Sequence, residues 1–101
     1  MNKEEIKTKI KEAIECNPLR DDIQKVSLFG SYINSAPRQD SDVDILIEFT
    51  PSARIGFFKL AQIRRDMEQF VKKPIDLLTP EAISRFFREQ VIKESEIVYE
   101  K

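Results

Sequence analysis

The chain has 101 residues, of which 41% are hydrophobic and 35% are charged, and its formal net charge is −1. This length and composition predict one folded domain over residues 1–101, with a modest core and no room for a second domain. The nearly neutral charge offers no broad basic surface for duplex nucleic acid, and no apolar run approaches the length of a membrane span.

Two residue counts narrow the chemistry further. The chain has no histidine, which excludes Ser-His-Asp and Cys-His catalysis and histidine-based zinc sites. Its single cysteine, Cys16, precludes an internal disulfide and fits a reducing cytoplasm, and the N-terminal residues are amphipathic and unlike a signal peptide. We therefore expect a cytoplasmic protein whose acid–base chemistry depends on Asp, Glu, Lys, Tyr or water.

The first half of the chain is predicted to contain a helix followed by two strands. Residues 2–16 carry an apolar stripe at helical spacing, and Asn17–Pro18 ends the helix. Apolar and β-branched runs predict strands over residues 23–29 and 43–49, with a short helix starting at Ser31 between them.

The second half of the chain is predicted to contain a helix, a third strand and further helical segments. Residues 56–71 read as an amphipathic helix, and residues 73–79 as a short third strand. Thr79–Pro80–Glu81 predicts the start of another helix, whose apolar side would pack in the core through Ile83, Phe86, Phe87, Val91 and Ile92, and a terminal helical piece is expected to reach Val98. The fold class is therefore α/β, a small mixed sheet of three to four strands flanked by about four helices.

The most informative stretch is the pattern G-S-x10-D-x-D, from Gly30 to Asp44. Asp42 and Asp44 are two residues apart at the start of a strand, so their side chains should project toward the same face. Two carboxylates held this close repel one another unless a cation lies between them, and oxygen ligands of this kind suit Mg²⁺ or Mn²⁺.

Gly30 and Ser31 complement the carboxylates. A glycine at the end of a strand lets the backbone approach a ligand closely, and a following helical turn directs free N–H groups at an anion. The stretch therefore predicts a phosphate-binding turn opposite a metal-binding pair of aspartates.

With these residues the stretch resembles the signature of the minimal nucleotidyltransferases in the DNA polymerase β superfamily. The resemblance extends from about Ile23 to Tyr99. It implies the nucleotidyltransferase fold and the transfer of AMP from ATP, with Mg²⁺ held by Asp42, Asp44 and a third aspartate on the next core strand, for which Asp76 is the matching residue. Gly30 and Ser31 would bind the β- or γ-phosphate, and either Asp76 or a metal-bound hydroxide would accept the proton of the attacking hydroxyl.

The resemblance also implies an acceptor. The best known arrangement for such short chains is an antitoxin that adds AMP to a tyrosine of a HEPN-type ribonuclease toxin. Such a toxin is therefore the expected partner, and a second copy of this chain is another candidate. The chain departs from the family after Gly-Ser, where members often have Ala-Arg-Gly and this sequence has Ile33, Asn34 and Ser35. The alternative reading is therefore a catalytically silent module that neutralises its partner by contact.

Overall fold

The computed structural model describes residues 3–30 and 42–101. In chain order its helices and strands are α1 (Lys3–Glu15), β1 (Ile23–Phe29), β2 (Val43–Phe49), α3 (Phe57–Val71), β3 (Ile75–Leu78), α4 (Arg85–Glu94) and β4 (Glu96–Glu100), with single 3₁₀ turns at Arg20–Asp22 and Pro80–Ala82. The two strands predicted for the first half are confirmed at both ends.

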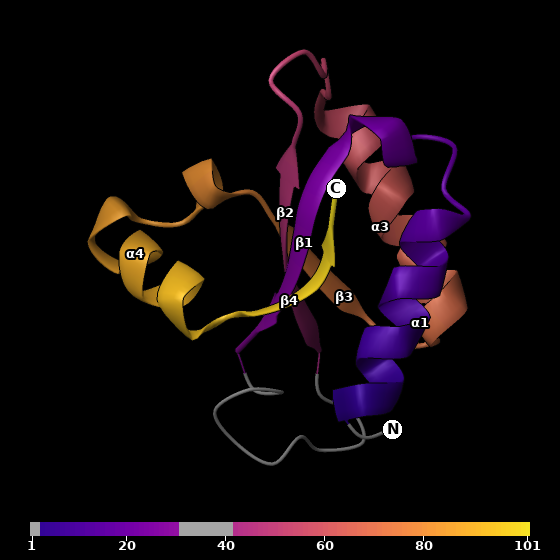
Figure 1. The fold of residues 1–101 in the computed structure, drawn as a ribbon, viewed down its shortest axis with the longest axis horizontal. Coiled ribbons are helices and arrows are strands. Elements are labelled where there is room, and N and C mark those ends of the chain that lie inside the picture. Colours follow the sequence, from indigo (N-terminus) through magenta and orange to yellow (C-terminus); the bar gives the residue numbers. More distant parts are fainter. Residues whose placement is uncertain (1–2, 31–41) are drawn as a thin grey trace.

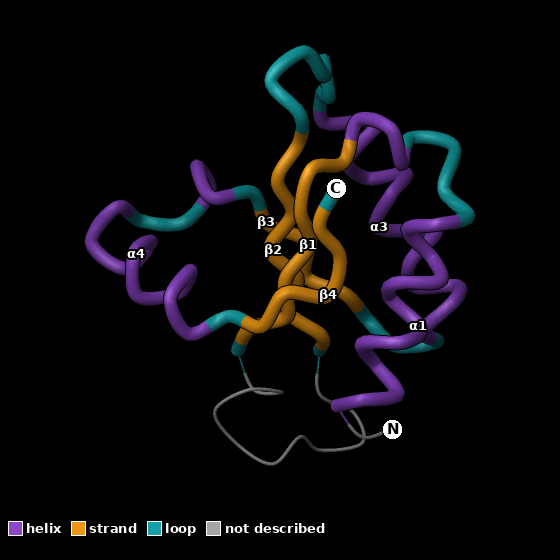
Figure 2. Tube along the Cα trace, viewed as in Figure 1, coloured by secondary structure: helices purple, strands orange, loops and turns teal. Residues whose placement is uncertain are grey.

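The strands form one mixed sheet in the order β3-β2-β1-β4 (Figures 1 and 2). β2 pairs with β1 in the antiparallel sense and with β3 in the parallel sense, and β4 is antiparallel to β1. The predicted fold class is therefore confirmed, although the described residues contain three α-helices where about four were expected.

One face of the sheet carries the hydrophobic core. Alternate residues of β1, β2 and β3 point to this face, which α1 and α3 cover (Figure 1). The fully or almost fully buried side chains there are Ile6, Ile10, Ala13, Ile14, Ile23, Val26, Leu28, Val43, Ile45, Ile47, Ile63, Met67, Val71, Ile75 and Leu77. The helical stripe of α1 and the alternation in β2 account for this burial.

The turn between α3 and β3 is fixed by backbone geometry and by one side chain. Lys72 adopts a left-handed conformation with φ of 61°, and its N–H donates to the carbonyl of Glu68 at 2.7 Å, which ends the helix. The N–H of Ile75 then donates to Glu68 Oε2 at 3.0 Å. These bonds set the position of β3, and with it the position of Asp76.

A charged cluster joins α1 to the last strand. Lys3 Nζ donates to Glu96 Oε1 at 2.8 Å, and Lys7 Nζ donates to Glu96 Oε2 at 3.4 Å. The hydrogen bond with Lys3 holds the pKa of Glu96 below its usual value, and the same bond raises the pKa of Lys3. The cluster attaches the N-terminal helix to β4.

Two predictions for the C-terminal region are wrong. The residues after Thr79 form only a 3₁₀ turn, and the helix begins at Arg85. Residues 96–100 are a strand paired with β1, because Ile97, Val98 and Tyr99 are β-favouring residues that complete the sheet next to β1.

The expected burial of α4 is also wrong. None of its residues is buried, and Phe86 and Phe87 are 82% and 61% exposed. The helix stands on the side of the sheet away from α1 and α3 (Figure 1), where it has few neighbours to cover its rings.

Some predictions lie outside the described residues. They are the helical start at Asn2, the helix from Ser31 and the phosphate-binding role of Ser31 itself. Within the described part of the chain, every helix is too short or too polar to cross a bilayer.

Candidate active site

Asp44 and Asp76 lie on neighbouring strands at the same level of the sheet. They are direct partners in the parallel β2–β3 pair, so their side chains project from the same face. That face is opposite the one that carries Val43, Ile45, Ile75 and Leu77. The sequence predicted that Asp76 would join the aspartate pair, and the strand register places its backbone beside that of Asp44.

Asp42 immediately precedes β2 and is exposed. The N–H of Val43 donates to the carbonyl of Pro74 at 2.9 Å, which extends the pairing of the two strands to the residue next to Asp42. Asp42 and Asp44 therefore lie on either side of Val43, the first residue of β2, at the same end of the sheet as the start of β3.

Gly30 faces Asp44 from the end of β1. Phe29 is the antiparallel partner of Asp44, so Gly30 directly follows the residue that pairs with the aspartate. Gly30 has φ of +78°, and a Cβ built on it would lie 2.9 Å from Asp44 Cγ and still closer to Asp44 Oδ2. Only glycine meets both requirements, because it tolerates this backbone conformation and leaves room for the carboxylate.

The donor set fits a hard divalent cation in its chemistry, since it consists of carboxylate oxygens on adjacent strands. In residues 3–30 and 42–101, no three acidic or cysteine side chains are gathered closely enough to hold a metal ion as they stand. The residues that would hold one are Asp44 and Asp76, with Asp42 as the third candidate.

A pocket beside Gly30 was missed by the sequence reasoning. It is lined by Phe29 and Gly30 at the end of β1 and by Val91 and Glu94 of α4. Val91 was expected to lie in the core, and nothing in the sequence shows that the end of α4 returns to the end of β1. The only sequence signal for this pocket was the spacing of Val91 and Glu94, which are three residues apart and therefore lie on one face of a helix.

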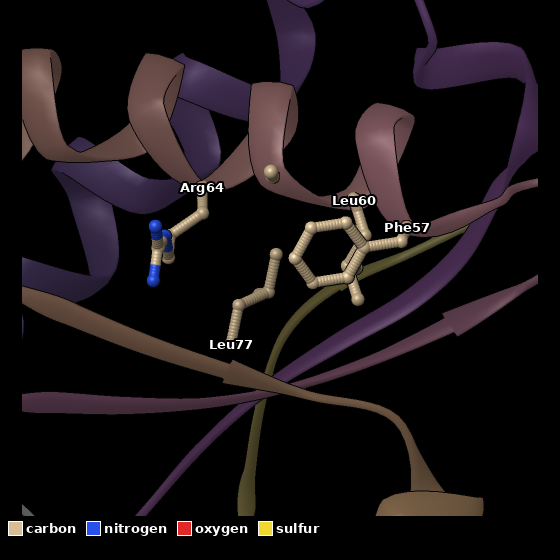
Figure 3. Close-up of a pocket in the computed structure, with 5 residues that line it drawn as sticks. Phe57, Leu60, Arg64 and Leu77 are labelled. Atoms are coloured by element: carbon tan, nitrogen blue, oxygen red, sulfur yellow. The ribbon is translucent and has the colours of Figure 1, made fainter.

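A second hollow lies on the helix-covered side. Phe57, Leu60, Ala61 and Arg64 of α3 and Leu77 of β3 line it, and Figure 3 shows Phe57, Leu60 and Leu77 pointing into the same space. It contains no carboxylate, and Leu77 follows Asp76 in an extended strand, so the hollow opens on the opposite face from the aspartates. We therefore do not include it in the site.

The mixed sheet with carboxylates at one end of the central strand β2 and of the outer strand β3 fits a nucleotidyl-transferring class of domain. The family described as "Polymerase beta, Nucleotidyltransferase" matches residues 8–101, and the chain belongs to this family. Over 95 residues it is 30% identical to MJ0435, a candidate protein adenylyltransferase of Methanocaldococcus jannaschii, and the match covers 94% of this chain and 96% of that protein.

Solved structures show the same fold. A candidate minimal nucleotidyltransferase is 25% identical, with a TM-score of 0.75 and coverage of 94% of both chains. A toxin–antitoxin complex with AMP-PNP gives a TM-score of 0.74 at 19% identity, over 94% of this chain and 73% of that one. A complex of a tri-AMPylated HEPN toxin with its MNT antitoxin, from Shewanella oneidensis, gives 0.67 at 17% identity, over 97% of this chain and 72% of that one.

Proposed function

We propose that this nucleotidyltransferase transfers AMP from ATP to a tyrosine hydroxyl of a partner protein, and that the partner is a HEPN-type toxin which the transfer inactivates. The observation that carries the proposal is the pairing of Asp44 with Asp76 on one face of the sheet, with Gly30 against the carboxylate of Asp44. The kinship with MJ0435 supports adenylyl transfer to protein, and the complexes of similar fold support ATP and a HEPN toxin as ligands.

In this reaction the tyrosine oxygen forms a bond to the α-phosphorus of ATP, and the bond from that phosphorus to the pyrophosphate oxygen breaks. The products are the AMP-tyrosine ester, pyrophosphate and the hydroxyl proton. When bound, Mg²⁺ would neutralise the charge of the triphosphate and stabilise the entering and leaving oxygens.

The chain's own residues have separate tasks. Asp42, Asp44 and Asp76 would hold the cation, and the exposed carboxylate of Asp76 is also the candidate to accept the hydroxyl proton. Gly30 lets the triphosphate approach the backbone at the end of β1, and we expect Ser31 to donate a further hydrogen bond to it. Positioning and charge neutralisation of this kind account for most of the catalysis in nucleotidyl transfer.

The exposed face of α4 supports a protein partner. Phe86 and Phe87 project large aromatic surfaces into solvent, since they are 82% and 61% exposed. Exposed aromatic groups gathered on one element are typical of surfaces that another protein covers. We propose that the reaction takes place in the cytoplasm, where the unpaired and exposed Cys16 remains reduced.

The decisive experiment incubates the protein with ATP, Mg²⁺ and a HEPN-type toxin, and measures AMP on the tyrosines of that toxin by mass spectrometry. Asp44→Asn and Asp76→Asn should each lower the transfer rate by roughly a hundredfold or more, because an amide cannot replace the charge of a metal-binding carboxylate. Asp21→Asn is the matched control, since Asp21 is an exposed aspartate in the 3₁₀ turn that precedes β1.

The result also separates the two readings of the sequence. An unmodified toxin that the wild-type protein and both site variants neutralise equally would reject adenylyl transfer and establish the silent binding module. Full transfer by Asp44→Asn would reject the site assignment.

A further inference from the structure

We propose that the pocket between the end of β1 and the end of α4 holds the nucleobase of the donor nucleotide, and that Glu94 selects adenine through its 6-amino group. This inference rests on the proposed function and deepens it, because it concerns the base specificity of the same site.

The pocket is continuous with the phosphate end of the site. Gly30 lines it and also contacts Asp44, so one residue borders both the carboxylates and the pocket. Phe29 pairs with Asp44, and its side chain therefore lies on the same face of the sheet as the aspartates. A nucleotide whose phosphates lie at Gly30 would have its base within reach of this pocket.

The size of the pocket favours a single planar group. Its volume is about 140 Å³. An apolar cavity of roughly 150 Å³ holds benzene, so the pocket can take part of a purine but not a whole nucleotide. Phe29 and Val91 provide apolar walls, which suit the faces of a base.

The charge of the pocket favours an amine over a phosphate. Glu94 is the last residue of α4, where the helix dipole adds partial negative charge. Gln90 Nε2 donates to Glu94 Oε1 at 3.3 Å, and an ionised carboxylate keeps further acceptor positions after one such bond. An N–H donor on a base complements this end of the pocket, whereas a phosphate would be repelled.

The first test fills the pocket. Val91→Trp should weaken Mg-ATP binding by about tenfold or more in calorimetry, because the indole would occupy the space of the base. Binding of Mg-tripolyphosphate, which has no base, should be unchanged. Ile92→Trp, the next position on the exposed side of α4, is the matched control for a large ring on this helix.

The second test changes one hydrogen bond. Inosine triphosphate differs from ATP at position 6, where a carbonyl replaces the amino group, so wild-type protein should prefer ATP by about tenfold. Glu94→Gln should reduce this preference to about twofold or less, since an amide can donate to the carbonyl as well as accept from the amine. Glu89→Gln, on another side of α4, should keep the wild-type preference.

The outcomes distinguish a failure of the proposed function from a failure of the base pocket alone. If wild-type protein binds neither tripolyphosphate nor ATP in the presence of Mg²⁺, the proposed function fails and the base pocket fails with it. If both bind, but Val91→Trp leaves ATP affinity unchanged or Glu94→Gln leaves the ATP preference unchanged, the base pocket alone is rejected.

Discussion

The two faces of the sheet differ in what their residues do. The face under α1 and α3 is closed, and its apolar side chains, such as Ile45 and Ile47, are fully buried. The other face is buried at Ser27 and Leu46 and ends in Phe29 and the aspartates. Stability is therefore concentrated on the first face, whereas the second carries the aspartates to which we assign the chemistry.

The largest effect is expected in the middle of the closed face. Ile45→Ala removes a fully buried side chain of the central strand β2 and should lower the free energy of unfolding by about 2–5 kcal/mol. Urea denaturation followed by circular dichroism measures the loss. A change below about 1 kcal/mol would contradict the assignment of this face as the source of stability.

Gly30→Ala tests the end of β1, where a strand of the closed face meets Asp44. The left-handed backbone costs an alanine about 1–2 kcal/mol, and the new methyl group must also displace the Asp44 carboxylate. We expect an intermediate loss of stability together with a large loss of transfer activity. Gly56→Ala is a suitable control, because a Cβ at Gly56 has no neighbour within 4 Å among the described residues.

A smaller and pH-dependent effect is expected from Glu96→Gln, at the edge of the closed face. The pKa of Glu96 is lowered in the folded protein, so its stabilisation is present above the usual glutamate pKa and is lost as the pH falls through the folded value. The melting temperature of the variant should be below that of the wild type at pH 7, and the two should converge as the pH falls through the folded pKa of Glu96.

The contribution of Lys3 to folding stability changes with pH in the opposite direction. Its pKa is raised by the same hydrogen bond, so its part of the stabilisation is present below the usual lysine pKa and is lost as the pH rises through the folded value. High salt should reduce the difference between Glu96→Gln and the wild type, because the cluster is partly exposed. A difference that persists in high salt, and at a pH low enough to protonate Glu96, would contradict the ionic origin.

The smallest effect on stability is expected on α4. The double substitution of Phe86 and Phe87 by alanine removes two exposed rings and should change the free energy of unfolding by about 0.5 kcal/mol or less. Pull-down with the partner toxin should nevertheless weaken clearly. Unchanged partner binding would remove α4 from the proposed interface, and a large loss of stability would contradict its exposed position.

The closed face and the strand that carries Asp44 were predictable from the sequence. Period-two alternation in residues 43–49 and helical spacing in residues 3–15 are local signals, and they set which side chains are buried. The D-x-D pattern predicts Asp42 and Asp44 on one side by the same rule, and Asp44 lies in β2 as expected. The position of Asp76 required the family resemblance, because strand order is not a local property.

The region after β3 was not predictable in the same way. The apolar pattern of Phe86, Phe87 and Ile92 resembles that of a core helix, and only the tertiary structure shows that none of the described elements covers it. Likewise, β4 forms because it pairs with β1, which lies more than sixty residues away in the chain. The pocket of Val91 and Glu94 depends on this long-range return and therefore has no sequence signature of its own.

The location of Asp76 has a consequence for the size of the acceptor. β3 is the outer strand of the described sheet on the side of β2, and Asp76 is exposed on it. A carboxylate at an open rim can be approached sideways by a residue that remains attached to a large folded body, whereas a site at the bottom of a deep cleft admits only small or flexible molecules. Under the proposed role of Asp76, this position would let a whole protein present one side chain for modification without first unfolding.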